Sequence, residues 1–225
     1  MFSRSPKNPA RHSASLVTAT KPAELSPLEA AIMDACNLLH EVRAAKDAAR
    51  TAEVRSHLFD LLDKYDASDA ENHPNPAWAR ANQRALAHSA AGEVEQAIVT
   101  ERIALRYADT DRRREISLGN LADRCLRLGR YEEAIEHFLA AQDVAPQSVP
   151  VMLTGAQALA LAGFSDEADR IFRQFLTAEH LRPGTELVAY LEYEPRLGEL
   201  AAGLPALAEL MARWERTKPR DRKRE

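Results

Sequence analysis

The side chains that could bind a metal ion occur in this sequence as small, separate sets. Cys36 and His40 lie four residues apart, so a helix would place them on one face. Two ligands do not make a zinc site, and no HExxH motif or cysteine cluster completes the set. His137 lies beside Glu133 and Glu136, where local charge pairing is the simplest account. The sequence therefore predicts no metal site and no cofactor.

Motifs for catalysis are not found either. The chain has eight glycines but neither a glycine-rich phosphate loop nor a GxSxG element. His57 and Asp60 have the three-residue spacing of a surface pair on a helix. An acidic and aromatic group near the C-terminus, interpreted as a capping surface, consists of Tyr190, Glu192, Tyr193 and Glu194. We therefore expect a protein that is not an enzyme.

An arginine-rich band is the most distinctive charged feature. Eight arginines lie within 29 residues: Arg102, Arg106, Arg112, Arg113, Arg114, Arg124, Arg127 and Arg130. Arginine makes bidentate contacts with carboxylates and phosphates. The candidate contacts for an anionic partner are Arg102, Arg106, Arg113 and Arg124. Four acidic residues lie among the arginines, so a salt-bridged solvent face is the favoured interpretation.

The net charge of −4 is distributed unevenly. Residues 1–23 have four basic residues and no acid, whereas residues 213–225 have seven basic and three acidic residues. Each end is thus +4 and the body is −12, which favours anionic partners for the ends but opposes binding of a polyanion to the body. Two distant cysteines without a CxxC motif favour a reducing compartment, and we expect a cytoplasmic protein.

The N-terminal part predicts an arm followed by a helical hairpin. Residues 1–25 are expected to be a basic, disordered arm, with an organellar transit peptide as the alternative. Ser26, Pro27 and Glu29 have the pattern of a helix N-terminus. Apolar spacing predicts helices over 27–46 and 51–65, so 27–76 is a hairpin and a loop. The sequence has no apolar run of about 18 residues, so no membrane-spanning helix is predicted.

A helix–glycine–helix pattern then recurs over 78–111, 115–148 and 149–182. Its turn glycines, Gly92, Gly129 and Gly163, are 37 and 34 residues apart. The apolar positions of the middle unit are Leu118, Leu121, Ala122, Cys125, Ala134, Phe138 and Ala141. Residues 183–217 are predicted to be C-terminal capping helices, and 218–225 a basic charged tail.

The segment LGRYEEAIEHFLAAQDVAP resembles the second half of a tetratricopeptide repeat, and the three units over 77–182 are similar to this family. The resemblance implies an all-α fold, an α–α superhelix of about three helical hairpins with helical capping elements at both ends. The first unit departs from the family at Arg84, where a large apolar residue is usual. It departs again at Glu101, where an aromatic residue is usual.

The resemblance also implies a binding groove, because the first helix of each unit lines the concave face in this family. The residues carried onto this groove are Asn82, Gln83, Asn120, Asp123, Arg127, Thr154 and Gln157. Amide side chains suit peptide binding because they donate and accept hydrogen bonds. The cations of chaperone-binding members have no counterparts at Ala79, Pro150 and Thr154, so a chaperone clamp is not expected. Simple solvation of the helices is an equal alternative for these polar residues.

These features predict a scaffold or adaptor that binds a partner protein or peptide, either alone or as a subunit of a larger complex. One alternative is a nucleic-acid or anionic-surface binding protein that uses the basic ends and the arginine-rich band. Another is a self-assembling oligomer whose basic tail docks on the acidic body of a neighbour. The sequence leaves the partner and the oligomeric state open.

Overall fold

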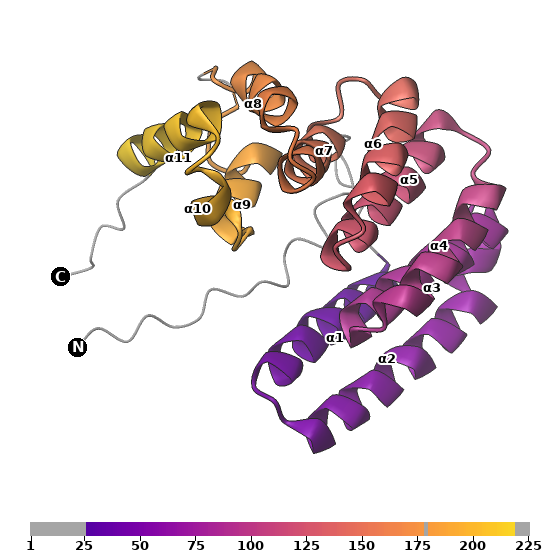
Figure 1. Ribbon diagram of the computed structural model, residues 1–225. Coiled ribbons are helices and arrows are strands. Elements are labelled where there is room, and N and C mark those ends of the chain that lie inside the picture. The colour runs from indigo at the N-terminus through magenta and orange to yellow at the C-terminus, as the bar shows by residue number, and fades with distance from the viewer. Residues whose placement is uncertain (1–25, 178–179, 219–225) are drawn as a thin grey trace.

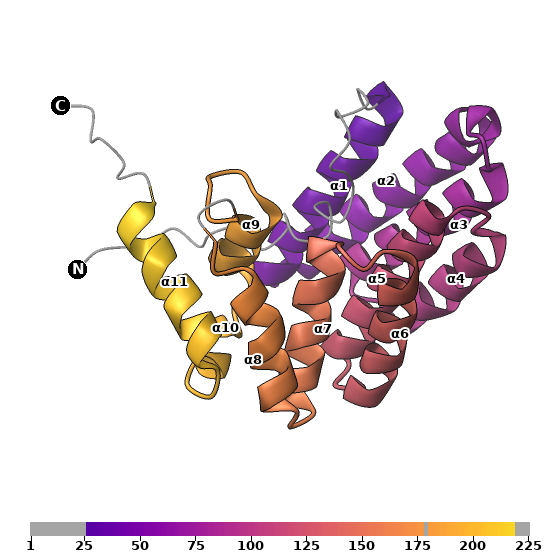
Figure 2. The ribbon, with the colours of Figure 1, turned by 90° about the horizontal axis from the view of Figure 1, so that it is seen from above.

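The computed structural model describes residues 26–177 and 180–218, and every regular element within them is helical. In chain order the elements are α1 (Pro27–Ala44), α2 (Ala48–Ala67), the 3-10 helix η2 (Asp69–Asn72), α3 (Pro76–Ala91), α4 (Val94–Tyr107), α5 (Asp111–Arg127), α6 (Tyr131–Val144), α7 (Val149–Leu161), α8 (Ser165–Gln174), α9 (Glu186–Tyr193), α10 (Leu197–Leu200) and α11 (Pro205–Thr217). Helices that follow one another in the chain pack in adjacent pairs (Figures 1 and 2). The all-α prediction is confirmed, while the arm over 1–25 and the tail from 219 onward lie outside the described residues.

The first helix begins at the predicted cap. Ser26 Oγ accepts a hydrogen bond from Glu29 N at 3.1 Å, and Ser26 N donates one to Glu29 Oε2 at 2.9 Å. The second helix begins at Ala48, ahead of the predicted residue 51, because Asp47 Oδ1 accepts from Arg50 N at 2.9 Å. A local aspartate cap, rather than the first apolar position, therefore sets this boundary.

Each repeated turn uses a glycine in the left-handed region. Gly92, Gly129 and Gly163 have φ values of 79°, 72° and 92°, where a Cβ would be strained. After Gly129, Arg130 N donates to Cys125 O at 2.9 Å, which closes the end of α5 in a Schellman-type arrangement. These turns reverse the chain within the pairs α3/α4, α5/α6 and α7/α8. Ala97, Ala134 and Ala168 are fully buried on the second helices and allow each pair to approach closely.

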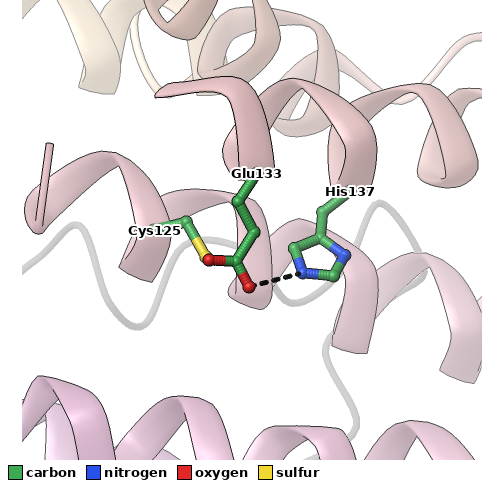
Figure 3. A group of neighbouring side chains, drawn as sticks. All are labelled: Cys125, Glu133 and His137. Carbon is green, nitrogen blue, oxygen red and sulfur yellow. Dashed lines mark ion pairs between the residues drawn. The ribbon is translucent and has the colours of Figure 1, made fainter. Parts of the chain in front are cut away.

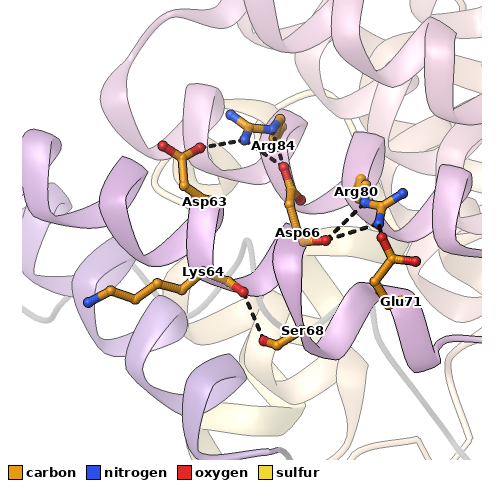
Figure 4. A network of polar contacts seen from close by, with 7 residues as sticks. All are labelled: Asp63, Lys64, Asp66, Ser68, Glu71, Arg80 and Arg84. Atoms are coloured by element: carbon orange, nitrogen blue, oxygen red, sulfur yellow. Dashed lines mark hydrogen bonds and ion pairs between the residues drawn. The ribbon is translucent and has the colours of Figure 1, made fainter.

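Charged residues join the N-terminal hairpin to the first repeated unit (Figure 4). Arg84 Nη2 lies 2.7 Å from Asp63 Oδ1 and 2.5 Å from Asp66 Oδ2 of α2. Arg80 donates to the main-chain oxygen of Asp66 at 3.0 Å and pairs with Glu71. Arg84, at a position where a large apolar residue was expected, therefore pairs with acidic residues of α2 instead of packing against apolar side chains.

The C-terminal helices cover the last repeated unit. Asp169 Oδ1 of α8 accepts a hydrogen bond from Ala206 N of α11 at 2.7 Å. Leu204, the residue before α11, has no capping side chain, so Asp169 caps this helix from another element. The short α10 was not predicted, because Pro195 and Gly198 indicated an interruption of helical structure. Within the described ranges, no helix has both the length and the hydropathy that crossing a bilayer requires.

Candidate functional site

Three of the seven predicted groove residues point into the protein. Asn82, Asn120 and Gln157 are only 6%, 5% and 1% exposed, so the prediction that they face a partner is wrong. Both asparagines donate to Glu101 of α4 at 3.2 Å. Gln157 Oε1 accepts from Tyr190 OH of α9 at 3.0 Å. Buried amides require such partners, and here they come from other helices, 19 to 33 residues away along the chain.

A buried ion pair accounts for the unusual Glu101. Arg124 Nη1 lies 2.6 Å from Glu101 Oε2, and the two side chains are 2% and 0% exposed. Burial raises the pKa of Glu101, whereas Arg124 and hydrogen bonds from Ser117 and Asn82 act to lower it. Trp78 Nε1 donates to Ser117 Oγ at 3.1 Å and extends the network toward α3. The prediction that Arg124 contacts an anionic partner is wrong, because its charge is paired inside the protein.

The predicted acidic and aromatic surface near the C-terminus is only partly a surface. Tyr190 is buried, and its bond to Gln157 attaches α9 to α7. Burial raises the pKa of Tyr190 well above its usual value. Glu194 Oε1 accepts from Arg196 Nε at 2.9 Å. The interpretation of Tyr190 as a surface residue is therefore wrong, because its ring fills the contact between two helices.

Four of the predicted groove residues remain accessible, and we call them the first-helix face: Gln83, Asp123, Arg127 and Thr154. They come from α3, α5 and α7, the first helix of each repeated pair. Arg127 Nη2 lies 2.9 Å from Asp123 Oδ2, and Arg127 Nη1 reaches Ser89 Oγ at 3.5 Å. Half-exposed ion pairs of this kind contribute little to stability, so a ligand group can replace them at small cost.

His40 of α1 lies near the first-helix face. Its pKa is lowered to about 4, because burial disfavours the charged ring and because Arg127 and Arg43 add positive charge. The ring Nε2 is buried and has no hydrogen-bond partner among the described residues. His40 is therefore neutral in the folded protein at neutral pH.

Acidification is expected to destabilise the protein through His40. The unfolded histidine takes up a proton near pH 6.5, whereas the folded one does so only at about 4. Stability is therefore lost as the pH falls through this window. We expect His40→Gln to have a flatter dependence of unfolding free energy between about pH 7 and 5 in urea titrations. The exposed His57→Gln is the control, and a slope unchanged in His40→Gln would contradict the assignment.

The arginine-rich band is largely paired with neighbouring acids. Arg102 pairs with Glu133, and Arg113 Nη1 lies 2.6 Å from Asp109 Oδ1. The band members Arg112, Arg114, Arg127 and Arg130 also have ion pairs. Of the four predicted anion contacts, Arg106 is exposed and has no ion pair within the part of the chain that the structure describes. The band therefore corresponds to the salt-bridged face that the sequence favoured.

A group of metal-ligand side chains lies between α5 and α6 (Figure 3). Cys125 Sγ, a Glu133 carboxylate oxygen and a His137 ring nitrogen all lie within 4.8 Å of one another. Burial raises the pKa of the Cys125 thiol to about 12. Sequence reasoning found the Glu133–His137 pair but missed Cys125, which lies on the preceding helix and reaches the pair only through the turn at Gly129.

An apolar stripe on α4 was also missed. Val99, Ile103 and Tyr107 are 51%, 38% and 51% exposed, and their four-residue spacing puts them on one side of the helix. This spacing is visible in the sequence. Spacing alone does not distinguish an exposed stripe from a stripe that faces the core, so the structure was needed to recognise it.

Comparison with known proteins adds no family assignment. No protein-family model and no curated protein matches this sequence. The functional interpretation therefore depends on the paired helices and on the residues described above.

Proposed function

We propose that this protein is a tetratricopeptide-type scaffold that binds a partner protein or peptide on its first-helix face. The observation that carries the proposal is a recurrent turn, in which left-handed Gly92, Gly129 and Gly163 separate two helices at intervals of 37 and 34 residues. Hairpins repeated in this way stack along one direction and create extended binding surfaces. The proposed architecture is an α–α superhelix, with α1/α2 and α9–α11 as its terminal elements.

The chemistry of the first-helix face suits an extended peptide that carries an acidic group. Arg127 offers a planar pair of donors, which matches a carboxylate in bidentate geometry. The amide of Gln83 can donate to and accept from a peptide main chain. Asp123, now paired with Arg127 at 2.9 Å, would be released to accept from a donor of the ligand.

A pull-down with the full-length chain as bait, followed by affinity measurement with the captured partner, tests the proposal. Arg127→Glu is expected to weaken binding by about tenfold or more, since an interface arginine commonly contributes above about 1.4 kcal/mol. The matched control is Arg170→Glu on α8, another accessible arginine that is paired with an acidic residue of its own helix, here Glu167. Equal affinity of wild type and Arg127→Glu would contradict the proposed location.

The apolar stripe on α4 supports a second candidate surface. Three large side chains on one exposed face are typical of a partner contact. A partner bound there would lose affinity on Ile103→Lys and keep it on Arg127→Glu. The pattern of these two variants therefore distinguishes the two surfaces of the same scaffold.

Nucleic-acid binding and self-assembly remain the alternative functions. The ion pairs of the arginine-rich band leave few free cations for phosphates, so nucleic-acid binding would depend on the chain ends. Such binding would fall steeply with salt and disappear when residues 1–25 and 219–225 are removed. Sedimentation of the full chain at low salt tests self-assembly, which a monomer would exclude.

A further inference from the structure

Three potential metal ligands converge on one point beside α5 and α6. Glu133 and His137 lie four residues apart on α6, so both side chains project from one face. Cys125 projects toward them from α5, and Figure 3 shows its sulfur directed at the Glu133 carboxylate. The three donor atoms lie within 4.8 Å of one another.

The His137 ring has an unused nitrogen at this point. His137 Nε2 is buried and has no hydrogen-bond partner among the described residues. The nearest acidic atom, Glu133 Oε1, is 3.9 Å away, which is too long for a hydrogen bond. An unpaired buried nitrogen is unfavourable, and a bound cation would satisfy it.

We propose that Cys125, Glu133 and His137 bind a Zn²⁺ ion. A thiolate, an imidazole and a carboxylate are the ligands that zinc prefers, and ligand bonds of about 2.0–2.3 Å in a tetrahedron separate the ligand atoms by roughly 3.3–3.8 Å. The donor atoms all lie within 4.8 Å of one another, so none is more than about 1 Å beyond this range, a difference that side-chain rotation can close. The Cys125 thiol proton passes to solvent as the zinc–sulfur bond forms. Water fills the fourth position.

Two arginines compete with the metal for the carboxylate. Arg102 pairs with Glu133, and Arg130 Nη1 lies 3.8 Å from Glu133 Oε2. Their side chains are 48% and 41% exposed, so both can turn toward water when a cation arrives. Arg130 also pairs with Glu95, which gives it an alternative partner. Removal of Arg102 should therefore strengthen metal binding.

The zinc site is separate from the first-helix face. Cys125 is two residues from both Asp123 and Arg127, and each residue of an α-helix turns by about 100°. Cys125 therefore projects from the side of α5 opposite these two residues. Because the two sites do not share side chains, metal binding can be measured in the absence of the partner proposed for the first-helix face.

Cobalt titration of the full-length chain under reducing conditions tests the site, with Co²⁺ as a visible substitute for zinc. We expect one Co²⁺ to bind per chain and to give a thiolate-to-cobalt charge-transfer band together with the d–d bands of a tetrahedral ion. Added Zn²⁺ should displace the Co²⁺ and abolish these bands. Cys125→Ser should lose the charge-transfer band, and His137→Gln should weaken binding. Cys36→Ser, which alters the other cysteine, is the matched control and should bind as the wild type does.

Arg102→Gln gives a test that leaves all three ligands in place. It is expected to tighten Co²⁺ binding by about tenfold, within the range of about 10–100-fold that groups around a metal site produce. Circular dichroism shows whether each variant is folded. The proposal is overturned if the wild type has no charge-transfer band, if Cys125→Ser keeps it, or if Arg102→Gln binds no more tightly.

Discussion

Glu101→Gln is expected to lower the free energy of unfolding by about 3–5 kcal/mol. The substitution keeps the side-chain volume and one acceptor oxygen, whereas Asn82 and Asn120 donate to different carboxylate oxygens of Glu101. It removes the charge 2.6 Å from Arg124, which is 2% exposed and so cannot be solvated instead. Arg124 Nε already lacks a hydrogen-bond partner among the described residues. Urea unfolding followed by circular dichroism measures the loss.

A double-mutant cycle identifies the ion pair as the cause. Arg124→Gln alone leaves Glu101 as an unpaired buried charge and should cost a similar amount. The double variant Glu101→Gln/Arg124→Gln has two neutral, hydrogen-bonding side chains, and we expect an interaction energy of about 2 kcal/mol. Glu53→Gln breaks an exposed pair with Arg50 and should change stability by less than about 0.5 kcal/mol. Strictly additive losses in the cycle would show that the two charges are not coupled.

Gly155→Ala is expected to lower the free energy of unfolding by about 2 kcal/mol. A Cβ at Gly155 of α7 would overlap the ring of Phe138 on α6, which is 2% exposed and enclosed by the core. Overpacking of this kind costs up to about 3 kcal/mol, and the helix propensity of alanine offsets about 1 kcal/mol of it. Thermal and urea unfolding of the variant measure the net effect.

Gly119→Ala is the matched control for this prediction. Gly119 is also inside a helix, but its added Cβ would meet only Val151 Cγ2 at 3.5 Å, an ordinary contact. Helix propensity then dominates, and we expect stabilisation by up to about 1 kcal/mol. Phe138→Leu should recover part of the loss in the Gly155→Ala background. Effects of the same sign at Gly119 and Gly155 would argue against the contact between Phe138 and Gly155 as the cause.

The contrast between Glu101 and Phe138 shows where sequence reasoning reached its limit. The two residues are 37 residues apart, the same interval that separates Gly92 from Gly129, so they occupy equivalent places in successive units. The departure of Glu101 from the expected aromatic residue was evident in the sequence. Its partner Arg124 was instead interpreted as a possible contact for an external anion. Only the packing of α4 against α5 shows that the two charges meet.

The sequence by itself determined the features that depend on nearby residues. The cap at Ser26, the glycine turns and the helical pairs follow from main-chain geometry and hydrogen bonds spanning a few residues. The predicted start of a helix was late where, as at Asp47, a polar cap precedes the apolar pattern. The sequence shows directly that the predicted groove positions on the first helix of each pair are polar. It does not show whether their side chains are exposed to solvent.

Tertiary structure alone decided which polar side chains face solvent. Asn82, Asn120 and Gln157 are buried because α4 and α9 bring Glu101 and Tyr190 to them. The Cys125, Glu133 and His137 donor atoms likewise converge only when the turn at Gly129 brings α5 against α6. Helical periodicity gives the direction of a side chain about its own axis. It does not give the neighbour that this side chain meets, which depends on how separate helices pack.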